Sequence, residues 1–284
     1  MSSSATGPIG RTDAIHALVR NVVDARYENM SEMAVDATKI FILDSLGVAI
    51  AGSLAPGVSE TLGILRDWGG KGESTVLVSG EKLPAPSSAM MNSFLMHNQE
   101  FDCVHDLAVV HAFTTVLPVA IAVAEAQGGV TGREFLIAVA LGVDVASSIG
   151  ISSRSPIAHF RPGTAGAFGA VAAAGKIAGF DQATLSNAMG IVYSQICGTL
   201  QPHSEGAQVN SMQTGFNARA AVTAISLAAQ GIQGASEVLE GRYGYFRLFE
   251  GEYDVEEALA NLGNVWQVER IGHKPFPCGR LTHG

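Results

Sequence analysis

Apolar residues recur at helical spacing along much of the chain. Between residues 34 and 52 the run stops at Gly52, a residue type that favours helix C-termini, and its apolar members include Ala34, Ile40, Phe41, Leu43, Leu46, Val48 and Ile50. We predict a buried helix there. Similar runs predict further helices over residues 115–127, 182–198, 215–230 and 255–262.

Two segments carry more specific helix signals. Thr131 and Glu134 form a capping-box pattern directly before an apolar run, which predicts that a helix starts there. Between residues 163 and 179 glycine and alanine dominate, and such a sequence is a stable helix only where neighbouring helices press closely against it. We therefore expect this helix at the centre of the fold.

Strand signals are weak by comparison. Residues 67–88 hold repeated glycines and prolines around the short β-like run STVLVSG, which predicts a loop with one strand or a small hairpin. The sequence has no βαβ alternation and no fixed-period repeat. The predicted fold class is therefore all-α, arranged as a large orthogonal helical bundle.

Composition narrows the range of partners and compartments. The 26 acidic residues exceed the 17 basic ones and no basic cluster occurs, so nucleic acid and anionic membranes are not expected partners. Three irregularly spaced cysteines predict neither a disulfide framework nor a metal motif. The N-terminus has no secretory pattern, and the apolar stretch 135–149 is short for a bilayer and contains Asp144. We predict a cytoplasmic protein.

One short segment concentrates groups that could carry chemistry. Residues 98–111 contain Glu100, Asp102, His105, Asp106 and His111 in an otherwise charge-poor region. A histidine beside a carboxylate suits acid–base work, because the carboxylate fixes its tautomer. The spacing matches no familiar metal motif, so no metal is predicted. The alternative is a polar helix end whose carboxylates only cap it.

Other polar residues could bind an anionic substrate. Arg161 precedes the small-residue helix, whose N-terminus favours a bound carboxylate. A polar island further along contains Asn210, and basic groups gather near the end of the sequence at Lys274, Arg280 and His283. A surface arginine, a loop leading into a helix and a frayed terminus would explain these three features equally well.

Several stretches, in order and spacing, resemble the MmgE/PrpD superfamily, which includes methylcitrate dehydratase, cis-aconitate decarboxylase and iminodisuccinate epimerase. The match spans nearly the whole chain. The residues that carry it are 43–47 with 51–52, 92–102, His111, Pro118, 124–125, 162–166, Gly169, 215–219, 239–241, Gly244, 274–277 and 282–283.

This resemblance implies a large helical domain over residues 1–272, a homodimer, and no metal or organic cofactor. Residues 273–284 would begin the smaller α+β domain of the family, or the segment leading to it. Because that smaller domain is otherwise absent from the sequence, we expect a truncated form.

The resemblance also assigns site residues. His111 and His283 match active-site histidines of the family, Glu100 stands where decarboxylase-like members carry an aspartate, and Asp102 matches the acidic element.

Three positions depart from the family pattern. Val104 replaces a threonine, Arg161 a histidine and Asn210 a lysine. Arg161 keeps a positive charge but cannot act as a base at neutral pH. The site is therefore expected to serve a different acid.

The resulting hypothesis is proton abstraction next to a carboxylate of a small di- or tricarboxylic acid. The residues expected to act as acid, base or relay are His111, His283, Asp102, Glu100 and, in reserve, His105. The residues expected to bind the substrate are Arg161, Arg280, Asn210 and Lys274. Departure of a leaving group would make a lyase resembling 2-methylcitrate dehydratase, whereas return of the proton to the other face would make an epimerase or isomerase. The remaining alternative is a non-catalytic, truncated helical protein.

Overall fold

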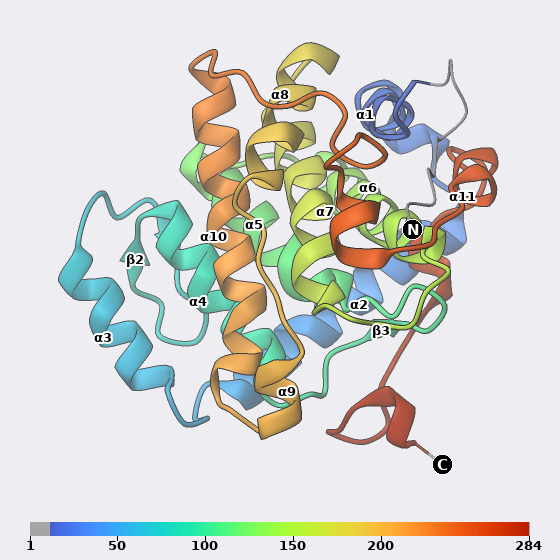
Figure 1. Cartoon of the computed structure of the whole chain (residues 1–284). Helices are drawn as coiled ribbons and strands as arrows, with labels where there is room; N and C mark the ends of the chain where they lie inside the picture. Colours follow the sequence, from blue (N-terminus) through green and yellow to red (C-terminus); the bar gives the residue numbers. More distant parts are fainter. Residues whose placement is uncertain (1–11, 284) are drawn as a thin grey trace.

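The computed structural model describes residues 12–283, which fold mainly into helices (Figure 1). The helices are α1 (Ile15–Asp24), α2 (Glu32–Gly52), α3 (Val58–Trp68), α4 (Ala85–His97), α5 (Ala112–Ala126), α6 (Gly132–Ser152), α7 (Arg161–Ile177), α8 (Gln182–Tyr193), α9 (Gln201–Glu205), α10 (Val209–Ala229) and α11 (Glu256–Ala260). The predicted all-α class is confirmed.

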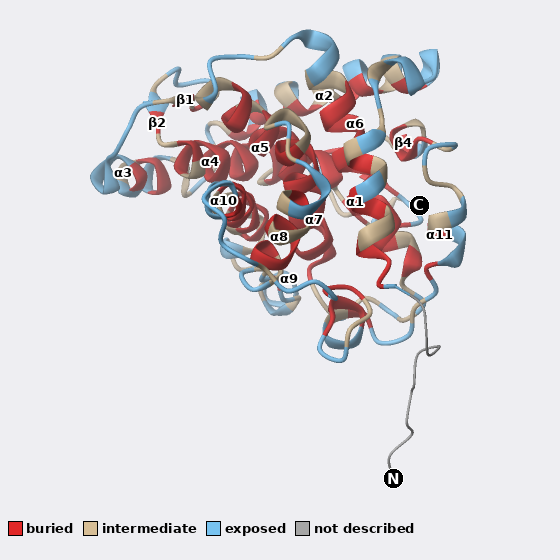
Figure 2. Ribbon diagram, turned by 90° about the horizontal axis from the view of Figure 1, so that it is seen from above, coloured by how far each residue is buried: buried red, intermediate tan, exposed pale blue. Residues whose placement is uncertain are grey.

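The small-residue helix α7 lies at the centre, as predicted, and packs against α5, α6 and α10 (Figure 2). Every residue from Arg161 to Gly175 is buried. Glycine permits this close contact, because a Cβ atom built on Gly169 would lie only 2.4 Å from the carbonyl oxygen of Gly142 on α6. This close packing makes the core rigid, so it holds the side chains at the helix ends in fixed positions.

The capping-box prediction is confirmed in both directions. The backbone N–H of Glu134 donates to Thr131 Oγ1 over 3.3 Å, and the N–H of Thr131 donates to Glu134 Oε2 over 2.8 Å. Elsewhere the predicted bounds shift. Helix α10 begins six residues earlier than predicted, at Val209, because its first turns are polar and carry no apolar periodicity.

The prediction of a helix over residues 34–52 is confirmed, but the helix is buried on one face only. Phe41 and Ala49 face the core, whereas Ile40, Leu43 and Ile50 are more than half exposed on the opposite side. Apolar residues occupy both faces of α2, and the sequence alone did not reveal which face the domain covers.

Two short antiparallel ladders complete the fold. β1 (Ser74–Thr75) pairs with β2 (Lys82–Leu83), which confirms the predicted hairpin. β3 (Val104–His105) pairs with β4 (Ile271–Gly272). The second ladder is the important one for function, because it brings the C-terminal segment beside residues 98–111.

After β4 the C-terminal segment of the described chain leads to a single helical turn at Arg280–Thr282, near the lower edge of the view in Figure 1. Within residues 12–283 no smaller α+β domain is evident, and the predicted boundary after residue 272 stays a prediction. In the same range one helix, α6, is long and apolar enough to cross a membrane. It is longer than the sequence pattern predicted, yet 83% of its most apolar window is buried inside the protein, as in the core helix of a globular domain.

Candidate active site

A buried carboxylate between two imidazoles forms the centre of the site. Asp102 Oδ2 lies 2.8 Å from His97 Nδ1 and 3.1 Å from His111 Nδ1, which also donates to the Cys103 carbonyl oxygen over 3.2 Å. Asp102 and His97 are each about 1% exposed. Because an ionised carboxylate only accepts hydrogen bonds, both imidazoles carry a proton on Nδ1 and direct Nε2 away from Asp102.

Local structure places these three residues together. His97 ends α4, His111 directly precedes α5, and Asp102 lies in the loop between them. The loop is strained, since Glu100 and Val109 have φ angles of 51° and 50°. Such values are costly for side chains with a Cβ, above all for a β-branched valine, and they occur preferentially at functional sites.

Lys274 fixes the loop between α4 and α5 through contacts with Glu100 and Asp102. Its ammonium donates to the Glu100 carbonyl oxygen over 3.0 Å and to Glu100 Oε2 over 3.2 Å, and it lies 3.5 Å from Asp102 Oδ1. The side chain of Lys274 is fully buried. Lys274 is therefore shared between the two carboxylates, balances one of their two charges and fixes the strained backbone at Glu100.

Neighbouring charges outweigh burial in setting the pKa values of His97, Asp102 and Glu100. Burial alone would lower the pKa of His97, but Asp102 and Glu100 outweigh burial and raise it. Burial would raise the pKa of Asp102, but His111 and His97 hold it well below its usual value. The pKa of Glu100 is likewise lowered, with burial opposed by His97 and Lys274. Asp102 therefore remains ionised.

His97 and His111 line a cavity of about 590 Å³, a volume that suits a small metabolite. Its lining brings together most of the predicted site, and we call it the imidazole chamber. The chemically active lining residues are His97, Glu100, Asp106, His111, His159, Arg161, His203, Arg280 and His283, with Val104 among the apolar ones. Five histidines on one cavity make it suited to moving protons and to binding anions when protonated.

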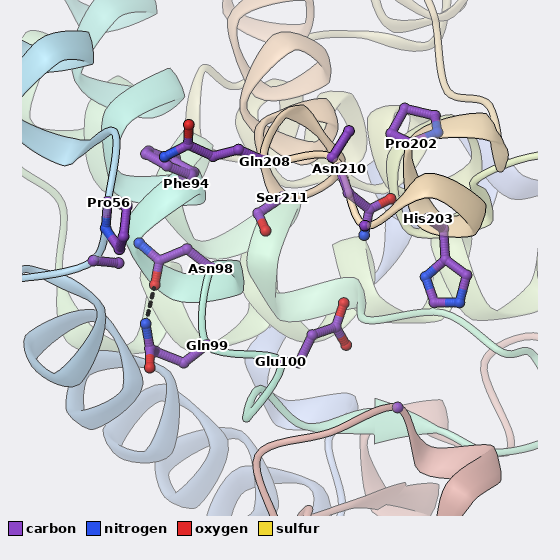
Figure 3. A pocket seen from close by; sticks show the side chains of 14 residues that line it. Pro56, Phe94, Asn98, Gln99, Glu100, Pro202, His203, Gln208, Asn210 and Ser211 are labelled. Atoms are coloured by element: carbon purple, nitrogen blue, oxygen red, sulfur yellow. Dashed lines mark hydrogen bonds between the residues drawn. The ribbon is translucent and has the colours of Figure 1, made fainter.

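A second cavity, of about 500 Å³, shares Glu100, His203 and Gly279 with the first (Figure 3). Its polar lining is mostly uncharged, and we call it the amide chamber. These uncharged polar residues are Asn98, Gln99, Gln208, Asn210 and Ser211. The predicted residue Asn210 therefore lies in this neighbouring space and not beside His111.

Arg161 lines the imidazole chamber but is already paired. Its guanidinium donates to Glu250 twice, over 3.0 Å from Nε and 2.7 Å from Nη2. Nη1 donates to the Ala108 carbonyl oxygen, and Nη2 also donates to Ser153 Oγ. The structure thus gives Arg161 a partner that the sequence did not reveal, and its binding of substrate stays a prediction.

Arg280 and His283 lie at the exposed side of the same chamber. Arg280 donates to Asp106 over 3.0 and 3.2 Å, and both side chains are at least 40% exposed. An exposed pair of this kind is weak and can exchange partners. The Nε2 atom of His283 is buried without a hydrogen-bond partner among the described residues.

His105 lies outside the chamber, although it is close in sequence. Its Nε2 donates to Gln267 Oε1 over 3.1 Å, and its Nδ1 accepts the N–H of Ala108 over 3.2 Å. Burial is the main cause of its lowered pKa. Both ring nitrogens are therefore engaged in holding the loop.

Sequence reasoning missed His97 and His159. His97 precedes the polar segment by one residue, and its position at a helix end, five residues before Asp102, was the available signal. His159 stands two residues before Arg161, and its Nδ1 donates to the Phe249 carbonyl oxygen over 3.0 Å, which leaves Nε2 as the acceptor. It lines the same chamber as Arg161.

The triad of His97, Asp102 and His111 also has ligand atoms within 4.8 Å of one another, as a metal site would require. Lys274 argues against this use, because its ammonium already supplies positive charge 3.5 Å from Asp102 Oδ1. A divalent cation there would face an adjacent buried cation. The arrangement fits proton transfer better than metal binding.

The described residues thus form a mostly helical domain with a histidine-rich cavity. The family model described as MmgE/PrpD N-terminal domain matches residues 16–258. The chain belongs to this family.

Curated relatives are cis-aconitate decarboxylases by name. The protein of Aspergillus terreus is 30% identical over 264 residues, which cover 88% of this chain and 54% of the relative. A cis-aconitate decarboxylase-like protein of Aspergillus oryzae is 27% identical, over 87% of this chain and 54% of its own. Human cis-aconitate decarboxylase is 25% identical, over 95% of this chain and 56% of the human protein. The chain spans about half the length of the curated relatives it matches.

Proposed function

We propose that this chain carries the acid–base site of a cofactor-independent lyase that acts on a small di- or tricarboxylic acid by proton transfer next to a carboxylate. The observation that carries the proposal is the Asp102–His111 contact. It fixes the proton on Nδ1 of His111 and leaves the Nε2 lone pair of a ring that is 11% exposed on the imidazole chamber.

In this mechanism His111 removes the proton and Asp102 stabilises the imidazolium that forms. Asp102 is suited to that role because its lowered pKa keeps it ionised. His97 donates to the same oxygen and so helps to hold Asp102 in place, while its Nε2 lies 3.7 Å from Glu100 Oε1 without a hydrogen bond.

His283 is the proposed partner acid, because its unpartnered Nε2 and its position on the same chamber allow it to protonate the carbon or the leaving group. Arg280 is the proposed carboxylate ligand, since it can leave its exposed pair with Asp106 for a substrate anion. Lys274 and Arg161 are engaged with internal carboxylates, and they act by holding the walls of the site.

The leaving group decides which lyase this is. Loss of water would give the dehydratase reaction expected from the likeness to 2-methylcitrate dehydratase, whereas the names of the relatives favour loss of carbon dioxide. Return of the proton to the opposite face would give an epimerase or isomerase. Val104, Arg161 and Asn210 alter the pocket, so the acid is proposed to differ from that of the relatives.

Proton exchange tests the proposal directly. Purified protein is incubated in D2O with citrate, methylcitrate, aconitate and malate, and deuterium next to a carboxylate is followed by NMR. We expect exchange with at least one acid, and loss of that exchange in His111→Ala but not in His105→Gln. Product analysis of the same samples distinguishes loss of water, loss of carbon dioxide and epimerisation.

The non-catalytic alternative predicts no exchange with any of these acids. The same silence from a chain extended to the length of the relatives would end the catalytic proposal. The cytoplasmic location and the homodimer are part of the proposal as well, and sedimentation of the purified chain gives its assembly state.

A further inference from the structure

The amide chamber differs in charge from the imidazole chamber beside it. Among the described residues that line the amide chamber, Glu100 is the one carboxylate, and none is lysine or arginine. Lys274, the nearest buried cation to Glu100, is directed at the Glu100 carbonyl and carboxylate oxygens. A carboxylate entering this space would meet a like charge and no permanent cation, since His203 is the one described lining side chain that can become positive.

Asn210 is held in one orientation by a chain of hydrogen bonds. The N–H of Thr199 donates to Gln213 Oε1 over 2.7 Å, and the Thr199 carbonyl oxygen accepts from Gln213 Nε2 over 3.1 Å. Backbone groups cannot exchange donor for acceptor, so they fix the Gln213 amide. Gln213 Nε2 in turn donates to Asn210 Oδ1 over 3.3 Å.

The consequence is a donor prepared for a ligand. With Oδ1 occupied by Gln213, the Asn210 amide presents Nδ2 as the group without an acceptor among the described residues, on a cavity that Ser211 also lines (Figure 3). Asn210 is also in the first turn of the 21-residue α10, where the helix dipole favours an acceptor oxygen. The site therefore offers donors to an oxygen atom, while Glu100 disfavours a full negative charge on that oxygen.

We propose that the amide chamber binds an uncharged polar arm of the substrate, such as a carboxamide, ester or hydroxyl group, through an acceptor oxygen that receives a hydrogen bond from Asn210 Nδ2. This inference rests on the proposed function, which places the substrate carboxylates in the imidazole chamber. The substrate class is then a carboxylic acid with one neutral hydrogen-bonding arm, and not a triacid with a carboxylate at each end.

A matched pair of probes tests the inference by calorimetry. Propane-1,2,3-tricarboxylate and its terminal monoamide differ in one group. The wild-type chain is expected to bind the monoamide at least about fivefold more tightly, the effect of one like-charge repulsion across about 4 Å in water. Asn210→Lys is expected to reverse this preference. Gln213→Leu, which releases Asn210, is expected to reduce it.

The control is Gln230→Lys, which adds the same charge at the far end of α10, about 30 Å away, and should leave the preference unchanged. Equal or tighter binding of the triacid by the wild type, or an unchanged preference in Asn210→Lys, would overturn the inference. Deuterium exchange is scored separately. Exchange without the amide preference overturns only the inference, the preference without exchange overturns only the proposed reaction, and absence of both binding and exchange overturns the two together.

Discussion

Glu250 accepts two hydrogen bonds from Arg161, and both side chains are at most 5% exposed. The two residues are 89 positions apart, Arg161 at the start of α7 and Glu250 at the end of a π-helical turn, Phe246–Glu250. Tyr245 and Thr164 extend the network, since the Tyr245 hydroxyl donates to Glu250 over 2.8 Å and lies 2.9 Å from Thr164 Oγ1. This pair fixes one wall of the imidazole chamber.

Replacing one member of the Arg161–Glu250 pair should destabilise the fold more than replacing both. Glu250→Gln leaves a buried guanidinium without its counter-charge and is expected to cost about 3–5 kcal/mol of unfolding free energy. The double variant Arg161→Met with Glu250→Leu should cost less, because no buried charge remains. Urea unfolding of both variants measures this difference, and a single variant as mild as the double one would contradict it.

Removing the charge of Asp102 should disable proton transfer without emptying the chamber. Asp102→Asn keeps the size of the side chain but no longer stabilises an imidazolium at His111, so the exchange rate is expected to fall on the order of a hundredfold or more. The rate of deuterium incorporation measures this effect. Asp36→Asn, at an exposed position of α2, is the control, and its rate of exchange should stay close to that of the wild type.

The pH dependence of stability should reveal the His97–Asp102 contact. The pKa of His97 is raised above its ordinary value of 6.5, so its protonation stabilises the folded state most fully below about pH 6.5, and this contribution is lost as pH rises through the folded-state pKa. We expect the wild type to lose more unfolding free energy than Asp102→Asn between about pH 6 and pH 8. Denaturant unfolding at both pH values tests the sign, and an equal or smaller loss in the wild type would disprove it.

The crossing of α6 and α7 allows a paired test of packing. Gly169→Ala places a Cβ 2.4 Å from the Gly142 carbonyl oxygen, a contact that backbone movement must relieve, and overpacking of this kind costs about 1–3 kcal/mol. Gly63→Ala, within α3, meets nothing within 4 Å and should stabilise by about 0.5–1 kcal/mol through helix propensity. Thermal unfolding should therefore shift in opposite directions.

Patterns local to the sequence predicted the fold well. The capping box at Thr131 and the small residues of α7 each specify structure within a few positions, and both predictions are confirmed. The two faces of α2 were not distinguishable, because Leu43 and Phe41 are both apolar and only tertiary packing decides which one is covered.

The sequence indicated several residues of the site but not which residues they contact. Glu100, Asp102 and His111 could be identified because they are crowded into one segment. The partners Lys274 and Glu250 come from distant segments that the β3–β4 ladder and the π-helical turn bring in, and no local pattern signals such long-range contacts. His105 shows the converse, since it lies among the site residues in sequence yet faces Gln267.

Because one oxygen of Asp102 serves both His97 and His111, the positions of the two rings depend on each other. A movement of Asp102 toward either ring lengthens its contact with the other, so the three side chains behave as one structural unit. A substitution at His97, whose ring centroid lies 5.3 Å from that of His111, would therefore disturb the contact between His111 and Asp102 without changing either of those residues.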